Sequence, residues 1–153
     1  MRSLGKDCYA NVKSAVRQIK MEYSKSQIEQ IIFKKFSASF MSDSKWEKMI
    51  DKLTDALDRE VFITFKLVHD SKSYCYSFCH SDFKPFFAEP TVYKEVEWIE
   101  FPDKYEYYVS RDNRKAGTKI YDQNLEEISR ALENIGKYEL EYLDNSIKLY
   151  AYQ

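Results

Sequence analysis

The chain has 153 residues, of which 44% are hydrophobic and 32% charged, and its formal net charge is −1. This length fits one globular domain with a sizeable core, and the near-zero charge argues against a nucleic-acid or membrane partner. Glycine and proline occur three times each, which argues against long flexible linkers. Aromatic residues make up 16% of the chain, and most are expected at core edges or interfaces.

The start of the chain and its cysteines bear on localisation. Met1 is followed by RSLGKDCYANVKSAV, which lacks the apolar run of a signal peptide, and no stretch reaches the length of a membrane span. A cytoplasmic protein is therefore predicted. The three cysteines, an odd number in a reducing compartment, are expected to be free thiols.

The first sixty residues have the apolar spacing of helices. Three helices are predicted, over residues 5–22, 26–39 and 44–58. Two capping-box patterns, Ser26 with Glu29 and Ser44 with Glu47, are expected to begin the second and third helices.

From residue 61 onward, β-branched and aromatic residues favour strands. Asn124 is expected to cap a further helix that ends at Gly136, where a left-handed backbone is expected. The strands are predicted at 61–68, 73–79, 91–101 and 105–110, a polar loop at 111–119, and a final hairpin from 138–143 and 147–152.

The links between successive strands are too short for parallel crossovers, so the sheet is expected to be mainly antiparallel. The predicted fold is a single α+β domain over residues 1–153. Its helical part spans 1–60, and its sheet part spans 61–153, with one helix before the C-terminal hairpin.

The segment SYCYSFCH, residues 73–80, raises the question of a metal site or a nucleophile. On a strand, Cys75 and Cys79 share one face but lie roughly 13 Å apart at about 3.3 Å per residue, too far to bind one zinc ion. A cysteine nucleophile would need His69 or His80 within hydrogen-bond reach, and the sequence does not fix the strand register. Buried, unreactive cysteines are the simpler interpretation.

Motifs for cofactors and catalysis are missing from the sequence. The three glycines are isolated, so neither a dinucleotide-binding nor a Walker pattern occurs, and no H-E-x-x-H, G-x-S-x-G or C-x-x-C is present. We therefore expect no catalytic residue, no metal and no cofactor.

An acidic, aromatic segment spans residues 89–106, with six carboxylates against two lysines, and YELEYLD at 138–144 adds three more carboxylates. Aromatic anchors with steering carboxylates suit a basic protein partner, although an ordinary outward strand face would look the same. The predicted partner-binding residues are Glu95, Glu97, Trp98, Glu100, Asp103 and Tyr105.

A basic stretch, SRDNRKAGTK at 110–119, is the main alternative site. Its Arg111, Arg114 and Lys115 could bind an anion or nucleic acid, because arginine pairs with phosphate and nearby tyrosines can stack on bases. The acidic surroundings argue for a solvated loop instead.

The stretches SDSKWEKMIDKL, WIEFPDKYEYYVSRDNRKAG and IYDQNLEEI together resemble an uncharacterised family of small bacterial cytosolic proteins. In size and composition the chain is also similar to immunity proteins of contact-dependent or polymorphic toxin systems. That second resemblance implies a cognate toxin as the partner and transfers no individual residue.

The leading hypothesis is a non-enzymatic immunity protein that neutralises a toxin, such as a nuclease, by occluding its active or substrate-binding surface. The alternative is an RNA- or nucleotide-binding module that uses the basic loop. A small enzyme using His69 or His80 with a cysteine is the third.

Overall fold

The structure is a computed structural model that describes residues 23–78, 90–110 and 112–153. The predicted helix over 5–22 lies outside these residues. The described elements are α2 (Lys25–Lys35), α3 (Asp43–Leu57), β1 (Val61–Leu67), β2 (Ser73–Phe78), α4 (Pro90–Glu95), β3 (Val96–Pro102), β4 (Lys104–Tyr108), a 3₁₀ turn (Arg114–Ala116), β5 (Thr118–Asp122), α5 (Leu125–Ile135), β6 (Glu139–Tyr142) and β7 (Ser146–Tyr150).

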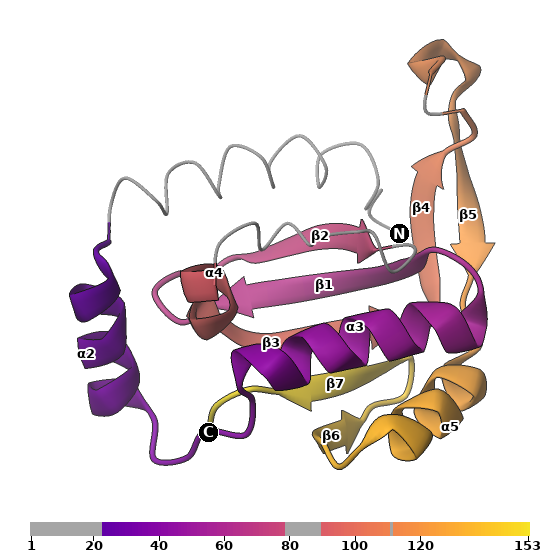
Figure 1. The fold of residues 1–153 in the computed structure, drawn as a ribbon. Coiled ribbons are helices and arrows are strands. Elements are labelled where there is room, and N and C mark those ends of the chain that lie inside the picture. The colour runs from indigo at the N-terminus through magenta and orange to yellow at the C-terminus, as the bar shows by residue number, and fades with distance from the viewer. Residues whose placement is uncertain (1–22, 79–89, 111) are drawn as a thin grey trace.

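A five-stranded antiparallel sheet, in the order β2-β1-β3-β7-β6, forms the centre of the fold (Figure 1). The predicted hairpins β1–β2 and β6–β7 are both present. On β2, Tyr74 and Tyr76 pack against the core, so Cys75 between them points to the opposite face of the sheet. The α+β class and the mainly antiparallel sheet are thus confirmed.

Helices α3 and α5 cover one face of this sheet and bury their apolar stripes on it (Figure 1). Phe65, Ile99 and Leu149, paired across β1, β3 and β7, are almost completely buried beneath the helices. From the helices, Leu53 and Leu132 are fully buried. This shared core fixes the position of α5 beside the C-terminal hairpin.

The two predicted capping boxes begin their helices at the wrong residue. The side chain of Ser24, not Ser26, caps α2 and forms the capping box with Gln27. Ser42, not Ser44, caps α3. Each helix thus uses the serine two residues earlier.

Of the two predicted ends of α5, the start is correct and the conformation at the C-terminal end is not. Asn124 caps the helix as predicted, by accepting a hydrogen bond from Glu127 N. Gly136 follows the helix with φ of 177°, which is extended and not left-handed. The chain therefore leaves α5 directly in a strand-like conformation.

The predicted strand over 91–101 is wrong in its first half, because residues 90–95 form α4. A helical turn there brings the Tyr93 ring onto Trp46 of α3, with centroids 6.2 Å apart, and buries both. Tertiary packing therefore overrides the strand preference of this segment, and β3 begins only at Val96.

The β4–β5 hairpin forms a separate two-stranded sheet that projects from one end of the five-stranded sheet (Figure 1). The predicted loop at 111–119 is wrong in extent, since it contains the 3₁₀ turn and the start of β5. Buried Gln123 ties the hairpin to the main sheet through bonds to Phe62 N, Phe62 O and Pro102 O.

Within the described residues, no helix has the length and apolar character needed to cross a bilayer.

Candidate protein-binding groove

The predicted acidic surface at 89–106 is divided by the fold. Glu95 ends α4 and is only 3% exposed, so its side chain lies inside the protein. The carboxylate of Glu97 forms ion pairs with Lys66 Nζ at 2.9 Å and Lys35 Nζ at 3.3 Å. Neither carboxylate stands at the surface as an unneutralised charge.

Trp98 and Glu100 lie on the sheet face opposite α3 and α5. Lys148 Nζ stands 4.0 Å from the centre of a Trp98 ring, within cation–π range. Glu100 accepts hydrogen bonds from Ser146 Oγ at 3.1 Å and Thr64 Oγ1 at 3.5 Å. These two side chains therefore interact mainly within the sheet.

Asp103 and Tyr105 lie where β3 passes into the hairpin. The backbone of Asp103 binds Asn145 O and Gln123 N, which joins the two sheets. Tyr105 stacks on Phe62 with ring centroids 3.6 Å apart. The six predicted contact residues are thus spread over α4, the sheet face opposite α3 and α5, and the base of the hairpin.

A row of rings at this base anchors the hairpin. Tyr121 also stacks on Tyr105, with ring centroids 5.4 Å apart, and Tyr107 meets Phe62 edge-on at 5.2 Å. Burial, followed by the nearby carboxylate of Glu60, raises the pKa of Tyr105 to about 12. These tyrosines therefore serve internal packing.

The basic side chains gather at the opposite end of the hairpin. Arg114 and Lys115 are exposed in the 3₁₀ turn, and the Arg114 guanidinium lies 5.3 Å from the Tyr108 ring centre. Lys119 stands equally far from the Tyr121 ring. Arg111 lies outside the described residues.

The cysteine and histidine segment forms no visible catalytic pair in the described part of the chain. Cys75 is disulfide-bonded, so the expectation of a free thiol is wrong at this position. His69 lies in the β1–β2 turn and stacks on Tyr23 at 4.3 Å, whereas Cys75 pairs with Thr64 well inside the hairpin. Cys8, Cys79 and His80 lie outside the described residues.

No group of three or more His, Cys, Asp or Glu side chains among residues 23–78, 90–110 and 112–153 is placed to hold a metal ion.

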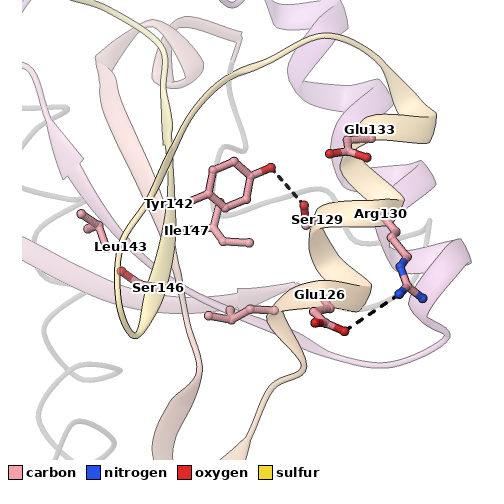
Figure 2. A pocket seen from close by; sticks show the side chains of 9 residues that line it. Glu126, Ser129, Arg130, Glu133, Tyr142, Leu143, Ser146 and Ile147 are labelled. Carbon is pink, nitrogen blue, oxygen red and sulfur yellow. Dashed lines mark hydrogen bonds and ion pairs between the residues drawn. The ribbon is translucent and has the colours of Figure 1, made fainter.

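Two hollows lie between α5 and the β6–β7 hairpin, and Figure 2 shows the first of them. One hollow of about 390 Å³ lies where the start of α5 faces the β6–β7 turn. A second, of about 510 Å³, lies where the end of α5 faces the start of β6. Glu133 and Tyr142 line both hollows, so the two adjoin along β6, and together they are called the groove.

The two sides of the groove are held by local structure and by the core. Ile128 and Leu132 fasten α5 to the sheet, which turns Glu126, Ser129 and Glu133 toward the groove. Across it, Tyr142 reaches toward α5, and its hydroxyl hydrogen-bonds Ser129 Oγ at 3.0 Å (Figure 2).

The groove combines exposed apolar surface with negative charge. Tyr142 is 58% exposed and Leu143 is 44% exposed, although both are large apolar side chains. Two basic residues also line the groove: Arg130, whose guanidinium lies 3.9 Å from the Glu126 carboxylate, and Lys137. The exposed carboxylates of Glu126, Glu133 and Glu139 line the groove, and those of Glu141 and Asp144 lie outside this lining on the β6–β7 hairpin.

The acidic stretch YELEYLD is visible in the sequence, but the element that packs beside it is not. Glu126 and Glu133 lie on the outer side of an amphipathic helix, and nothing in their spacing places them beside β6. Only the packing of α5 on the sheet unites the two acidic segments.

Residues 28–153 match the model of a family described as a family of unknown function (DUF6678), and the chain therefore belongs to that family. The predicted membership of an uncharacterised family is confirmed in this coarse form. Searches of curated proteins and of solved structures each found no match.

Proposed function

We propose that this member of the DUF6678 family is a non-enzymatic protein-binding protein that receives a basic partner in the groove between α5 and β6. The observation that carries the proposal is the exposed Tyr142–Leu143 pair beside a hollow bordered by carboxylates. An exposed apolar patch with a polar rim is the usual mark of a protein interface.

The chemistry of the groove suits this role. A tyrosine at an interface contributes large contact area at low entropic cost, and its hydroxyl keeps a hydrogen-bond partner. The surrounding carboxylates would speed the approach of a basic surface and reject an acidic one. This moves the proposed binding surface from residues 89–106 to α5, β6 and the β6–β7 turn.

Within this class, we propose an immunity protein of the bacterial cytoplasm, with a cognate toxin as the partner. A toxin that cleaves nucleic acid is basic where it meets phosphate, and an acidic groove presents a similar charge. Occlusion of that surface would neutralise the toxin without any chemical step.

Co-expression with the product of a neighbouring gene tests the proposal. The partner is expected to co-purify with the wild-type chain, which should also protect the cells from it. The Glu133→Lys/Glu141→Lys double variant should lose both effects, because it changes the net charge by +4 by reversing Glu133 in the groove and Glu141 on the adjoining strand β6. A groove variant that retains full capture and protection would contradict the proposal.

A matched control is available on α3. Glu47 and Asp55 are exposed on that helix, away from the groove. The Glu47→Lys/Asp55→Lys variant makes the same change in net charge and should capture the partner as the wild type does. Equal loss in both double variants would point to net charge, not to the groove.

A second candidate function is anion binding by the tip of the β4–β5 hairpin. It is favoured by the exposure of Arg114 and Lys115 at a projecting turn. Retention of fluorescent single-stranded RNA, weakened by salt and by Arg114→Ala/Lys115→Ala, would support it. Indifference of binding to both changes would remove this candidate.

A further inference from the structure

We infer that the groove binds its partner as an extended strand that pairs with the outer edge of β6 and carries basic side chains. This inference rests on the proposed protein-binding function and adds the mode of recognition. Strand addition to a sheet edge beside a helix is a common way to bind a peptide.

The free edge of β6 is the first observation. β6 is the last strand of the five-stranded sheet, and no described strand pairs with its outer side. Leu143 N donates to Ser146 O across the β6–β7 turn, at 2.9 Å. Because hydrogen-bonded positions alternate along an antiparallel pair, Leu140 and Tyr142 direct their backbone N–H and C=O groups away from β7.

The groove follows this edge along its length. The start of β6, with Tyr138 and Leu140, faces the end of α5, and the β6–β7 turn faces its start. Helix and strand therefore run in opposite directions on the two sides of the groove. A segment lying in the groove would run alongside β6, within hydrogen-bonding reach of its outer edge.

The side chains of β6 predict the pattern of the added strand. Leu140 and Tyr142 point to the face covered by α5, while Glu139 and Glu141 point to the opposite face, because side chains alternate along a strand. An added strand would therefore place alternate residues in the apolar groove near Glu133 and the others beside Glu139 and Glu141. Apolar residues alternating with lysine or arginine fit both faces.

Binding of a model peptide to the full-length protein tests this mode. The probe is a fluorescein-labelled ten-residue peptide in which valine and lysine alternate, measured by fluorescence anisotropy. Two further peptides carry N-methyl groups on all valines or on all lysines, each of which removes the donors of one strand edge and leaves the charge unchanged.

Strand addition predicts that one N-methylated peptide binds at least tenfold more weakly than the parent and that the other binds within threefold of it. Equal binding of all three peptides would overturn the inference, as would equal loss in both methylated forms. Absence of binding by the parent peptide would also overturn it.

Tyr142 offers a matched pair of protein variants. Tyr142→Ala removes the ring and keeps the backbone N–H, whereas Tyr142→Pro removes both, at an edge position where proline is tolerated. Proline should weaken peptide binding at least fivefold more than alanine does, with circular dichroism confirming that both variants fold. Equal binding by the two folded variants would count against strand addition.

The charge-reversal variant separates the two proposals. If Glu133→Lys/Glu141→Lys abolishes peptide binding while all three peptides bind the wild type equally, the groove is a protein site and only strand addition fails. If the charge reversal leaves peptide binding unchanged, the groove is not the site and the proposed function fails with the inference.

Discussion

The groove and the β4–β5 hairpin are both rich in tyrosine and charge, yet they are built in opposite ways. Residues 125–148 contain six acidic and three basic residues. The elements α5, β6 and β7 in this range all contribute to or pack on the main core. Over 104–122, five basic residues face three acidic ones, and the hairpin projects from the sheet (Figure 1). A net charge of −1 therefore conceals two surfaces of opposite sign.

The two surfaces are held in place by different contacts. The groove is positioned by residues of α5 and β7 that are themselves part of the hydrophobic core. The hairpin depends on Gln123 and on the stacking of Phe62 with Tyr105. Four predictions follow this contrast.

The largest effect is expected beneath the groove. Leu132 of α5 is fully buried in the core, so Leu132→Ala should lower the free energy of unfolding by about 2–5 kcal/mol through lost burial and the resulting cavity. Urea denaturation monitored by circular dichroism gives the value. Exposed Ile120 of the hairpin is the control, and Ile120→Ala should change stability by no more than about 0.5 kcal/mol.

A smaller effect is expected at the anchor of the hairpin. Gln123→Ala should lower the free energy of unfolding by about 1–3 kcal/mol, because it leaves the buried N–H and C=O of Phe62 without this side-chain partner. Hydrogen exchange should quicken in β4 and β5 much more than in α5. Asp122→Ala, at an exposed neighbouring position, should leave the exchange pattern unchanged.

The Tyr105 hydroxyl predicts a dependence of stability on pH. Its pKa of about 12 in the folded protein lies above the ordinary value of 10.0, so the unfolded chain releases this proton first. The contribution of this hydroxyl to the free energy of unfolding is fully present below pH 10 and is lost as the pH rises toward 12. Denaturant titrations at pH 9, 10 and 11 should show a steeper fall for the wild type than for Tyr105→Phe. Parallel curves would refute the assignment.

The smallest effect on stability is expected at the hairpin tip. Arg114 is exposed and contacts Tyr108 only through a cation–π interaction, so Arg114→Ala should shift the free energy of unfolding by about 0.5 kcal/mol or less. A thermal unfolding scan measures this. A larger loss would show that the tip, like the groove, is part of the cooperative structure.

The sequence predicted the fold best where local pattern and packing agree. The apolar stripe of α3 and the β-branched, aromatic strand β1 with its hairpin partner β2 are in this class. It failed at α4, where the packing of Tyr93 on Trp46 decides the conformation, and at the start of β5, since Thr118 and Lys119 fall within the predicted polar loop. Both depend on contacts made by distant residues.

The same limit applies to the candidate site. Glu95 and Trp98 belong to a segment whose sequence is acidic and aromatic. In the fold, α4 and the bulge between β1 and β3 separate them, so that Glu95 is buried whereas Trp98 lies beneath Lys148 on the sheet. Glu133 and Tyr142 become neighbours only after α5 docks on the sheet. Their proximity depends on tertiary structure, which periodicity does not encode.

The strand order of the main sheet has a kinetic consequence. Central β3 pairs through Ile99 with both Phe65 and Leu149, which lie far from it in opposite directions along the chain. Such long loops must close before these pairs gain stability, so refolding should be slow compared with that of a helical protein of this size. A newly made chain would thus complete the groove between α5 and β6 late, once the last strand has joined.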